Sequence, residues 1–232
     1  MANVAHATGA TPAAGLTEPG AKTATLCSLD HPALARLLQR AYSAERAASF
    51  AYIGHAASLR DPQAKAAVQQ IEDDEWAHRR HVLAIMRRHG VPVSRWFEAH
   101  YYVVGKLIGA SCHVIGRFMP YFFAGKLESG NVCEYFVMMR HFHALGITEH
   151  DAVLHEMGLK EKEHEVYFLA QIENCRWLPW FERVFAWGKH TSRNDVDLEH
   201  PGAAKDSHRY CAHHPGVIPR AGAKKPASAE AG

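Results

Sequence analysis

Two short stretches decide the fold: Glu75-Trp76-Ala77-His78 and Glu161-Lys162-Glu163-His164. In an α-helix, residues three apart lie on one face, so each stretch directs a carboxylate and an imidazole to the same side. A further glutamate precedes each stretch on a segment that we predict to be a separate helix. These are Glu45 before the first stretch and Glu134 before the second. The pattern therefore predicts four helices that direct carboxylates and imidazoles toward one place.

This set of side chains is typical of a metal centre. One glutamate from each of two helices, with Glu-x-x-His from each of two others, is the ligand set of a carboxylate-bridged dinuclear centre inside a four-helix bundle. All the candidates lie on apolar stripes of their predicted helices, where an unpaired charge is costly. Carboxylates and imidazoles without thiolates suit two Fe ions, with Mn as the alternative. The predicted ligands are Glu45, Glu75, His78, Glu134, Glu161 and His164.

Two further polar residues repeat in the same way. Tyr52 follows Glu45 by seven residues, and His141 follows Glu134 by seven. Seven residues are two helical turns, so each group lies on the same face as its glutamate. We predict that Tyr52 and His141 support the ligands through hydrogen bonds, as groups outside a metal's own ligands commonly do.

Composition restricts the protein class. The 232 residues are 47% hydrophobic and 22% charged, which is ample for a sizeable core. A net charge of +2 gives no reason to expect a nucleic-acid partner. The five cysteines are odd in number and scattered, which argues against a disulfide framework or a zinc ribbon. We therefore expect a cytoplasmic protein, with peripheral contact to the inner face of the membrane as an alternative.

The chain divides into three parts. Residues 1–22 lack the basic start and apolar run of a signal peptide, and we predict a disordered N-terminal tail. Residues 191–232 are polar, rich in proline and histidine and without a helical period, so we predict a disordered His-rich C-terminal tail, whose binding of metal is left open. Residues 23–190 form the predicted helical bundle.

Two segments extend the predicted bundle. The stretch 101–125 is aromatic and glycine-rich, but charged residues and a proline interrupt it, so it does not have the composition of a membrane span. Tight helix packing through the glycines is favoured there over a substrate channel or an interfacial surface. Residues 177–187 predict a short aromatic helix that covers the bundle, with a membrane anchor as the alternative. The predicted fold is all-α.

The pattern Glu45, Glu75-x-x-His78, Glu134, Glu161-x-x-His164 resembles the ferritin-like di-iron carboxylate superfamily over roughly residues 30–175. The interval of 30 residues between Glu45 and Glu75, the glycine-rich stretch and the Glu-x6-His element are most similar to demethoxyubiquinone hydroxylases. The resemblance implies a ferritin-like four-helix bundle in which Glu75 and Glu161 bridge the metals and the other four residues are terminal ligands.

The resemblance favours an oxidoreductase that uses O2 to hydroxylate or oxidise an apolar or aromatic, quinone-like substrate. Val137 stands where a rubrerythrin carries an extra glutamate, and there is no C-x-x-C pair, which disfavours peroxidase and storage functions. No dinucleotide fingerprint or P-loop is present, so electrons are expected from an external donor. A homo-oligomer is expected. The alternatives are a ferroxidase or iron-binding protein, and a non-enzymatic bundle that binds a partner or a membrane surface.

Overall fold

The computed structural model describes residues 29–189, and the regular secondary structure of these residues is all α-helical. The prediction of an all-α fold is confirmed for these residues. The predicted tails, 1–22 and 191–232, lie outside the described residues. The helices are α1 (Pro32–Ser58), α2 (Pro62–Arg88), α3 (Arg95–Ser111), α4 (Phe118–Ala144), α5 (Asp151–Ala170) and α6 (Leu178–Phe185).

Local sequence signals explain where α2 begins and ends. The Asp61 carboxylate accepts a hydrogen bond from the Ala64 amide and so caps the first turn, while Pro62 occupies a first-turn position whose N–H would have no partner. The last turn carries Arg87 and Arg88, which complement the negative end of the helix. The chain then turns at Gly90, whose φ of 65° is in the left-handed region that favours glycine.

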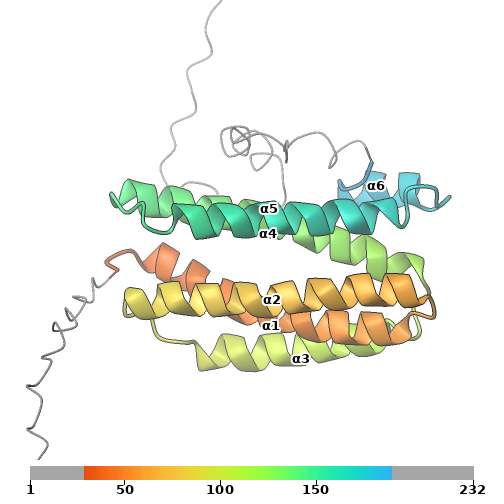
Figure 1. The fold of residues 1–232 in the computed structure, drawn as a ribbon, viewed down its shortest axis with the longest axis horizontal. Coiled ribbons are helices and arrows are strands. Elements are labelled where there is room, and N and C mark those ends of the chain that lie inside the picture. Colours follow the sequence, from red (N-terminus) through yellow and green to blue (C-terminus); the bar gives the residue numbers. More distant parts are fainter. Residues whose placement is uncertain (1–28, 190–232) are drawn as a thin grey trace, which may run out of the picture.

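The helices form layers (Figure 1). Helices α1 and α2 run antiparallel in one layer, and α4 and α5 run antiparallel in a second layer stacked on the first. Helix α3 lies on the outer side of α1, and α6 lies at one end of the α4–α5 pair. Short connections within each pair enforce the antiparallel arrangement.

The core between the layers is divided into two apolar clusters with polar side chains between them. Toward the end where α2 finishes, one cluster includes Leu38, Met86, Phe142 and Leu154. The other lies toward α6, with Val68, Phe122 and Phe168 among its members. Each of α1, α2, α4 and α5 carries a buried glutamate near its middle, and on α2 and α5 a buried histidine follows it by three residues. The bundle therefore encloses a polar centre between two apolar ends.

Glycines allow α3 to approach α1 at backbone contact. A Cβ atom on Gly54 of α1 would lie 2.3 Å from the carbonyl oxygen of Gly109, and one on Gly105 would lie 2.6 Å from that of Ala47. The prediction of tight packing through the glycines is confirmed. The opposite side of α3 leaves Trp96, Val103 and Leu107 exposed. Of the helices in residues 29–189, none combines the length and the apolar character that a membrane crossing requires.

The segment after α5 folds back on the bundle. Trp187 is fully buried, and its ring occupies the space that a Cβ on Gly125 would fill, 2.4 Å away. The Trp187 indole Nε1 donates a hydrogen bond to Glu165, which also forms a buried ion pair with Lys162 at 2.8 Å. These contacts hold α6 against α4 and α5, in agreement with the prediction of a covering helix.

The α1–α3 contact gives a stability prediction. Gly54→Ala should lower the free energy of unfolding by about 1–3 kcal/mol, because the added methyl group meets backbone that cannot move aside. The matched control is Gly130→Ala in α4, where an added Cβ has no neighbour within 4 Å and the change should stabilise by about 0.5–1 kcal/mol. Urea unfolding of both variants measures the difference. Equal effects of the two changes would contradict the close packing of α3.

Candidate metal centre

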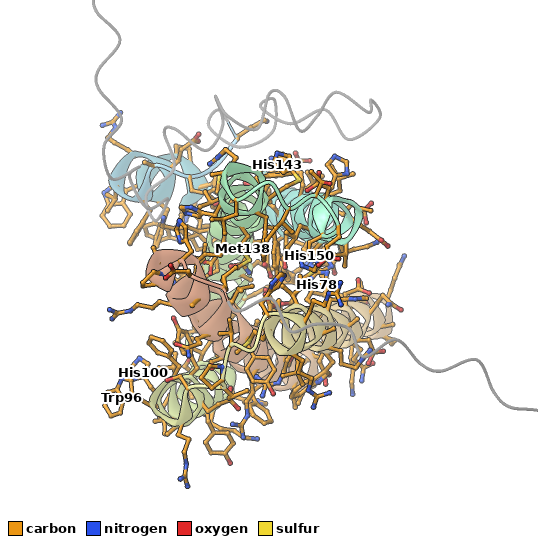
Figure 2. All side chains as sticks on the ribbon, turned by 90° about the vertical axis from the view of Figure 1, so that its left-hand side faces the viewer. His78, Trp96, His100, Met138, His143 and His150 are labelled. Carbon is orange, nitrogen blue, oxygen red and sulfur yellow. The ribbon has the colours of Figure 1, made fainter. Side chains whose placement is uncertain are left out.

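The middle turns of four helices bring six ionisable side chains together in the core. Helix α1 contributes Glu45, α2 contributes Glu75 and His78, α4 contributes Glu128, and α5 contributes Glu161 and His164. All six are buried. In the end-on view, His78 lies between the layer of α1 and α2 and the layer of α4 and α5 (Figure 2).

The six residues form two overlapping groups. Each group contains four residues whose ligand atoms all lie within 4.8 Å of one another. Glu75 and Glu161 belong to both groups. Two cation positions that share two carboxylates are the arrangement of a bridged dinuclear centre. One group is Glu45, Glu75, His78 and Glu161, and the other is Glu75, Glu128, Glu161 and His164.

The facing atoms are close together but do not satisfy one another. His78 Nδ1 lies 2.9 Å from Glu161 Oε1, and His164 Nδ1 lies 3.3 Å from Glu75 Oε1. None of these four atoms has a hydrogen-bond partner of acceptable geometry, although all are buried. Unpartnered buried polar atoms are rare in folded proteins because each forfeits its hydration. Their convergence here fits cations bound between them.

An acidic residue of α2 orients the imidazole of α5. His164 Nε2 lies 3.1 Å from Asp74 Oδ2, and Nδ1 of the same ring faces Glu75 and Glu161. When Nε2 donates to a carboxylate, the lone pair of Nδ1 is directed at the cluster, which is the usual way in which a metal-binding imidazole is held. Sequence reasoning missed Asp74, because a residue next to Glu75 does not lie on the helix face of the predicted stripe.

The structure corrects one predicted ligand. Glu134 belongs to neither group; instead its Oε2 accepts a hydrogen bond from Arg40 at 3.1 Å. Glu128, six residues earlier, occupies the place that we predicted for Glu134. Six residues correspond to about 600° of rotation in an α-helix, so the two carboxylates lie on different faces of α4. The apolar pattern of this segment could not distinguish the face of Glu128 from that of Glu134, because α4 buries residues on several sides.

Two tyrosine side chains form hydrogen bonds between α1 and α4. The Tyr52 hydroxyl donates a hydrogen bond to Glu128 Oε1, and the Tyr135 hydroxyl donates one to Glu45 Oε1. The sequence carried this signal: Glu128-x6-Tyr135 repeats Glu45-x6-Tyr52 with the same residue types. The predicted supporting role thus falls to Tyr52 and Tyr135.

His141 does not lie beside the centre. Its ring packs against His31 at a centroid distance of 4.9 Å, near the start of α1. Thirteen residues separate it from Glu128, or about 20 Å along α4. The prediction that His141 supports a ligand was wrong, because it was derived from the position of Glu134 rather than of Glu128.

The electrostatics of the centre reflect crowded carboxylates. Burial and the negative charge of Glu75 raise the pKa of Glu45 well above its usual range. Burial and the charge of Glu161 do the same to the pKa of Glu128. Burial alone would lower the pKa of His78, but the charge of Glu161 outweighs it and raises that pKa. Without cations, the chain holds extra protons here to offset mutual repulsion.

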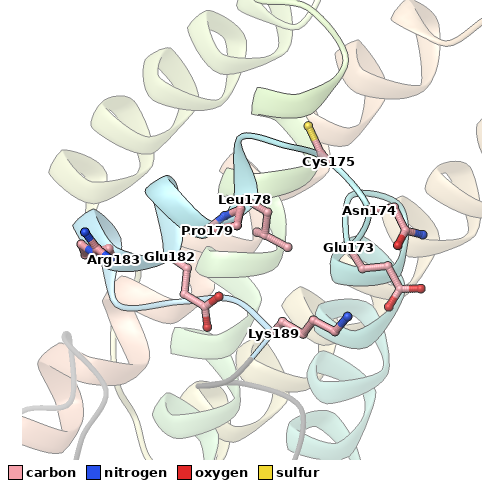
Figure 3. A pocket seen from close by; sticks show the side chains of 8 residues that line it. All are labelled: Glu173, Asn174, Cys175, Leu178, Pro179, Glu182, Arg183 and Lys189. Carbon is pink, nitrogen blue, oxygen red and sulfur yellow. The ribbon is translucent and has the colours of Figure 1, made fainter.

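A cavity near the C-terminal end of the described residues is separate from this centre. It has a volume of about 420 Å³ and lies beside α6, with Cys175, Leu178 and Arg183 among its lining residues (Figure 3). None of the six clustered residues lines it. By contrast, a gap of about 10 Å³ between α1 and α4 reaches Glu45, with Ala41, Ala44 and Glu134 in its walls.

Comparison with known proteins identifies no relative: no protein-family model, no curated protein and no solved structure matches the chain. The class that the fold and the site define is therefore an all-α helical bundle with buried glutamates and histidines that could bind metal.

The orientation of α4, which directs Glu128 rather than Glu134 into the cluster, gives a prediction about metal binding. Glu128→Gln should weaken binding of Fe(II) or Mn(II) by about tenfold or more, because losing a ligand costs at least as much as losing a group that supports one. Glu134→Gln, on the same helix, should leave metal binding close to that of the unaltered protein, since Glu134 pairs with Arg40. Titration followed by calorimetry measures both. A larger loss in Glu134→Gln than in Glu128→Gln would restore the sequence-based assignment.

The raised pKa values predict how the stability of the metal-free protein depends on pH. Glu45, Glu128, His78 and His164 release their protons at a higher pH in the folded chain than in the unfolded chain, because the pKa of each group is raised in the fold. The free energy of unfolding should therefore fall as the pH rises above 6.5, the ordinary pKa of histidine. Added metal should reverse the trend, since it binds the deprotonated ligands.

Thermal unfolding with and without Mn(II) across this pH range tests the linkage. Glu45→Gln with Glu128→Gln removes two of the four groups and should flatten the pH dependence of the metal-free protein. A metal-free protein that gains stability over the same range would show that these groups are not protonated in the fold.

Proposed function

We propose that the chain is a ferritin-like four-helix bundle built around a bridged dinuclear metal centre. The observation that carries the proposal is the sharing of Glu75 and Glu161 between two four-residue groups. In this arrangement Glu75 and Glu161, which belong to both groups, would help to hold both ions. Glu45 and His78 would complete the site of one ion, and Glu128 and His164 would complete the site of the other.

Iron is the proposed metal, with manganese as the alternative. Carboxylate oxygens and imidazole nitrogens suit these ions, and no cysteine lies in either group. Four carboxylates balance the charge of two divalent ions, which suits a site enclosed by apolar side chains. The chemistry that a pair of Fe(II) ions supplies when bound is reductive activation of O2.

The surrounding residues hold the ligands for this role. Tyr52 donates a hydrogen bond to Oε1 of Glu128, whose Oε2 accepts one from Asn131 at 2.9 Å. Tyr135 donates to Oε1 of Glu45, whose Oε2 is buried without a hydrogen-bond partner. Asp74 keeps Nδ1 of His164 directed inward. Ligands held by such contacts stay in position when the metals are exchanged or change charge.

The proposed activity is the O2-dependent hydroxylation or oxidation of an apolar or aromatic, quinone-like substrate. Apolar clusters flank the centre on both sides and exclude water from it. The gap beside Glu45 has the size of a single water molecule or O2, and the small side chains of Ala41 and Ala44 form part of its wall. We propose that the electrons come from an external donor and that the protein forms a homo-oligomer.

The experiment begins with metal-free protein reconstituted with Fe(II) under anaerobic conditions. We expect two irons per chain. On exposure to oxygen-18 gas with a short-chain quinone and a chemical reductant, the product should carry label from the gas. Mass spectrometry of the quinone measures this, and product formation should fall about tenfold or more in Glu128→Gln. Glu134→Gln is the matched control and should remain active.

Two outcomes would overturn the proposed activity. If O2 uptake stops once the added Fe(II) is oxidised, with or without quinone and reductant, the centre is a ferroxidase. If purified protein binds iron far beyond two per chain, storage is the better explanation. Binding of one ion per chain would contradict the dinuclear centre itself.

A further inference from the structure

A second group of metal-binding side chains lies at the end of the bundle where α2 finishes and α5 begins. His89 ends α2 and His150 precedes α5, and their Nε2 atoms are 2.6 Å apart. Both residues are buried, with 3% and 8% of their surface exposed. Figure 2 views the bundle from this end and shows His150 between the two layers.

A carboxylate completes the group. Glu149 Oε1 lies 3.5 Å from His150 Nε2 and 3.9 Å from His89 Nε2. The three ligand atoms all lie within 4.8 Å of one another. The Glu149 side chain is 45% exposed, so this side of the group is open to solvent. Two nitrogens and an oxygen thus converge from the ends of two helices.

The group is separate from the central cluster. His89 follows His78 by eleven residues on α2, and His150 precedes Glu161 by eleven on α5. Eleven residues correspond to about 16 Å along each helix. The apolar cluster that contains Met86, Phe142 and Leu154 lies between the two sites.

Packing holds the two imidazoles in position. The ring of Phe142 contacts both, with centroid distances of 5.3 Å to His89 and 4.7 Å to His150. His89 Nδ1 is buried without a hydrogen-bond partner.

We propose that His89, Glu149 and His150 bind a single divalent ion of the zinc class. Two imidazoles and one carboxylate are ligands that Zn(II) prefers, and three protein ligands leave a fourth position for water on the exposed side. In a tetrahedral site with Zn–N bonds of about 2.0–2.1 Å, neighbouring ligand atoms lie about 3.3 Å apart. The distance of 3.5 Å from Glu149 to His150 is near this value, and that of 3.9 Å from Glu149 to His89 is about 0.6 Å longer. The two rings, whose Nε2 atoms are 2.6 Å apart, must separate by about 0.7 Å.

The competing explanation is that the imidazoles share one proton in an N–H···N hydrogen bond. In that arrangement Glu149 forms an ion pair with Arg88, whose Nε and Nη2 atoms each lie 3.2 Å from a carboxylate oxygen of Glu149. Because this ion pair is exposed, it holds Glu149 only weakly and a divalent cation can displace it. A bound ion would join the end of α2 to the start of α5, which are the two helices that carry Glu-x-x-His.

The test uses full-length protein in which the central cluster is disabled by Glu75→Gln with Glu161→Gln, so that the result does not depend on the proposed central metals. Co(II) is the probe, because four-coordinate Co(II) absorbs visible light strongly and occupies zinc sites. We expect one tightly bound Co(II) with this absorption, displaced by one equivalent of Zn(II). Adding His150→Gln should remove the band and weaken binding by about tenfold or more.

His143→Gln is the matched control. This exposed histidine lies at the same end of the bundle and pairs with Asp151 at 2.7 Å, outside the proposed site, so the band should be unchanged. Glu149→Gln provides a second test that leaves the core untouched should His150→Gln fail to fold. If Co(II) binds with the same spectrum and affinity in the starting protein, His150→Gln and Glu149→Gln, the proposal is wrong and the imidazoles share only a hydrogen bond.

Discussion

Repulsion between four carboxylates enclosed in an apolar core is the constraint on which the rest of the structure depends. Glu45, Glu75, Glu128 and Glu161 come from four different helices, and all are buried. Held this close in a medium of low dielectric, they cannot all be ionised unless positive charge lies among them. The fold therefore has to bind cations or protons at its centre, and the surrounding hydrogen bonds keep the carboxylates in place for either.

The two helix pairs meet this constraint in nearly the same way. In each pair the first helix supplies a glutamate followed seven residues later by a tyrosine, and the second supplies Glu-x-x-His. Each tyrosine donates to the glutamate of the other pair, so neither half completes its site alone. The resulting dependence of each pair on the other links formation of the centre to association of the layers. Apolar clusters at both ends of the centre supply the burial that holds the layers together.

The additional helices differ in how they join this unit. Helix α3 attaches through backbone contact at Gly105 and Gly109, a mode that needs glycine because a Cβ would collide with α1. The segment after α5 attaches instead through a large side chain, Trp187, seated over Gly125. Small residues on one partner thus decide both contacts, and the aromatic composition of these segments alone does not indicate which face is buried.

The sequence by itself determined the helical class, the break at Asp61-Pro62, the end of α2 near Gly90 and the placement of Glu45, Glu75, His78, Glu161 and His164 on inward faces. These follow from local rules: a proline and a capping carboxylate begin a helix, and residues three apart share a face. Only the tertiary structure decided that Glu128, rather than Glu134, completes the cluster, and that Asp74 and the pair His89–His150 have partners far along the chain. Helix α4 packs against neighbours on several sides, so its apolar residues do not mark a single face, and contacts between helices alone set its register.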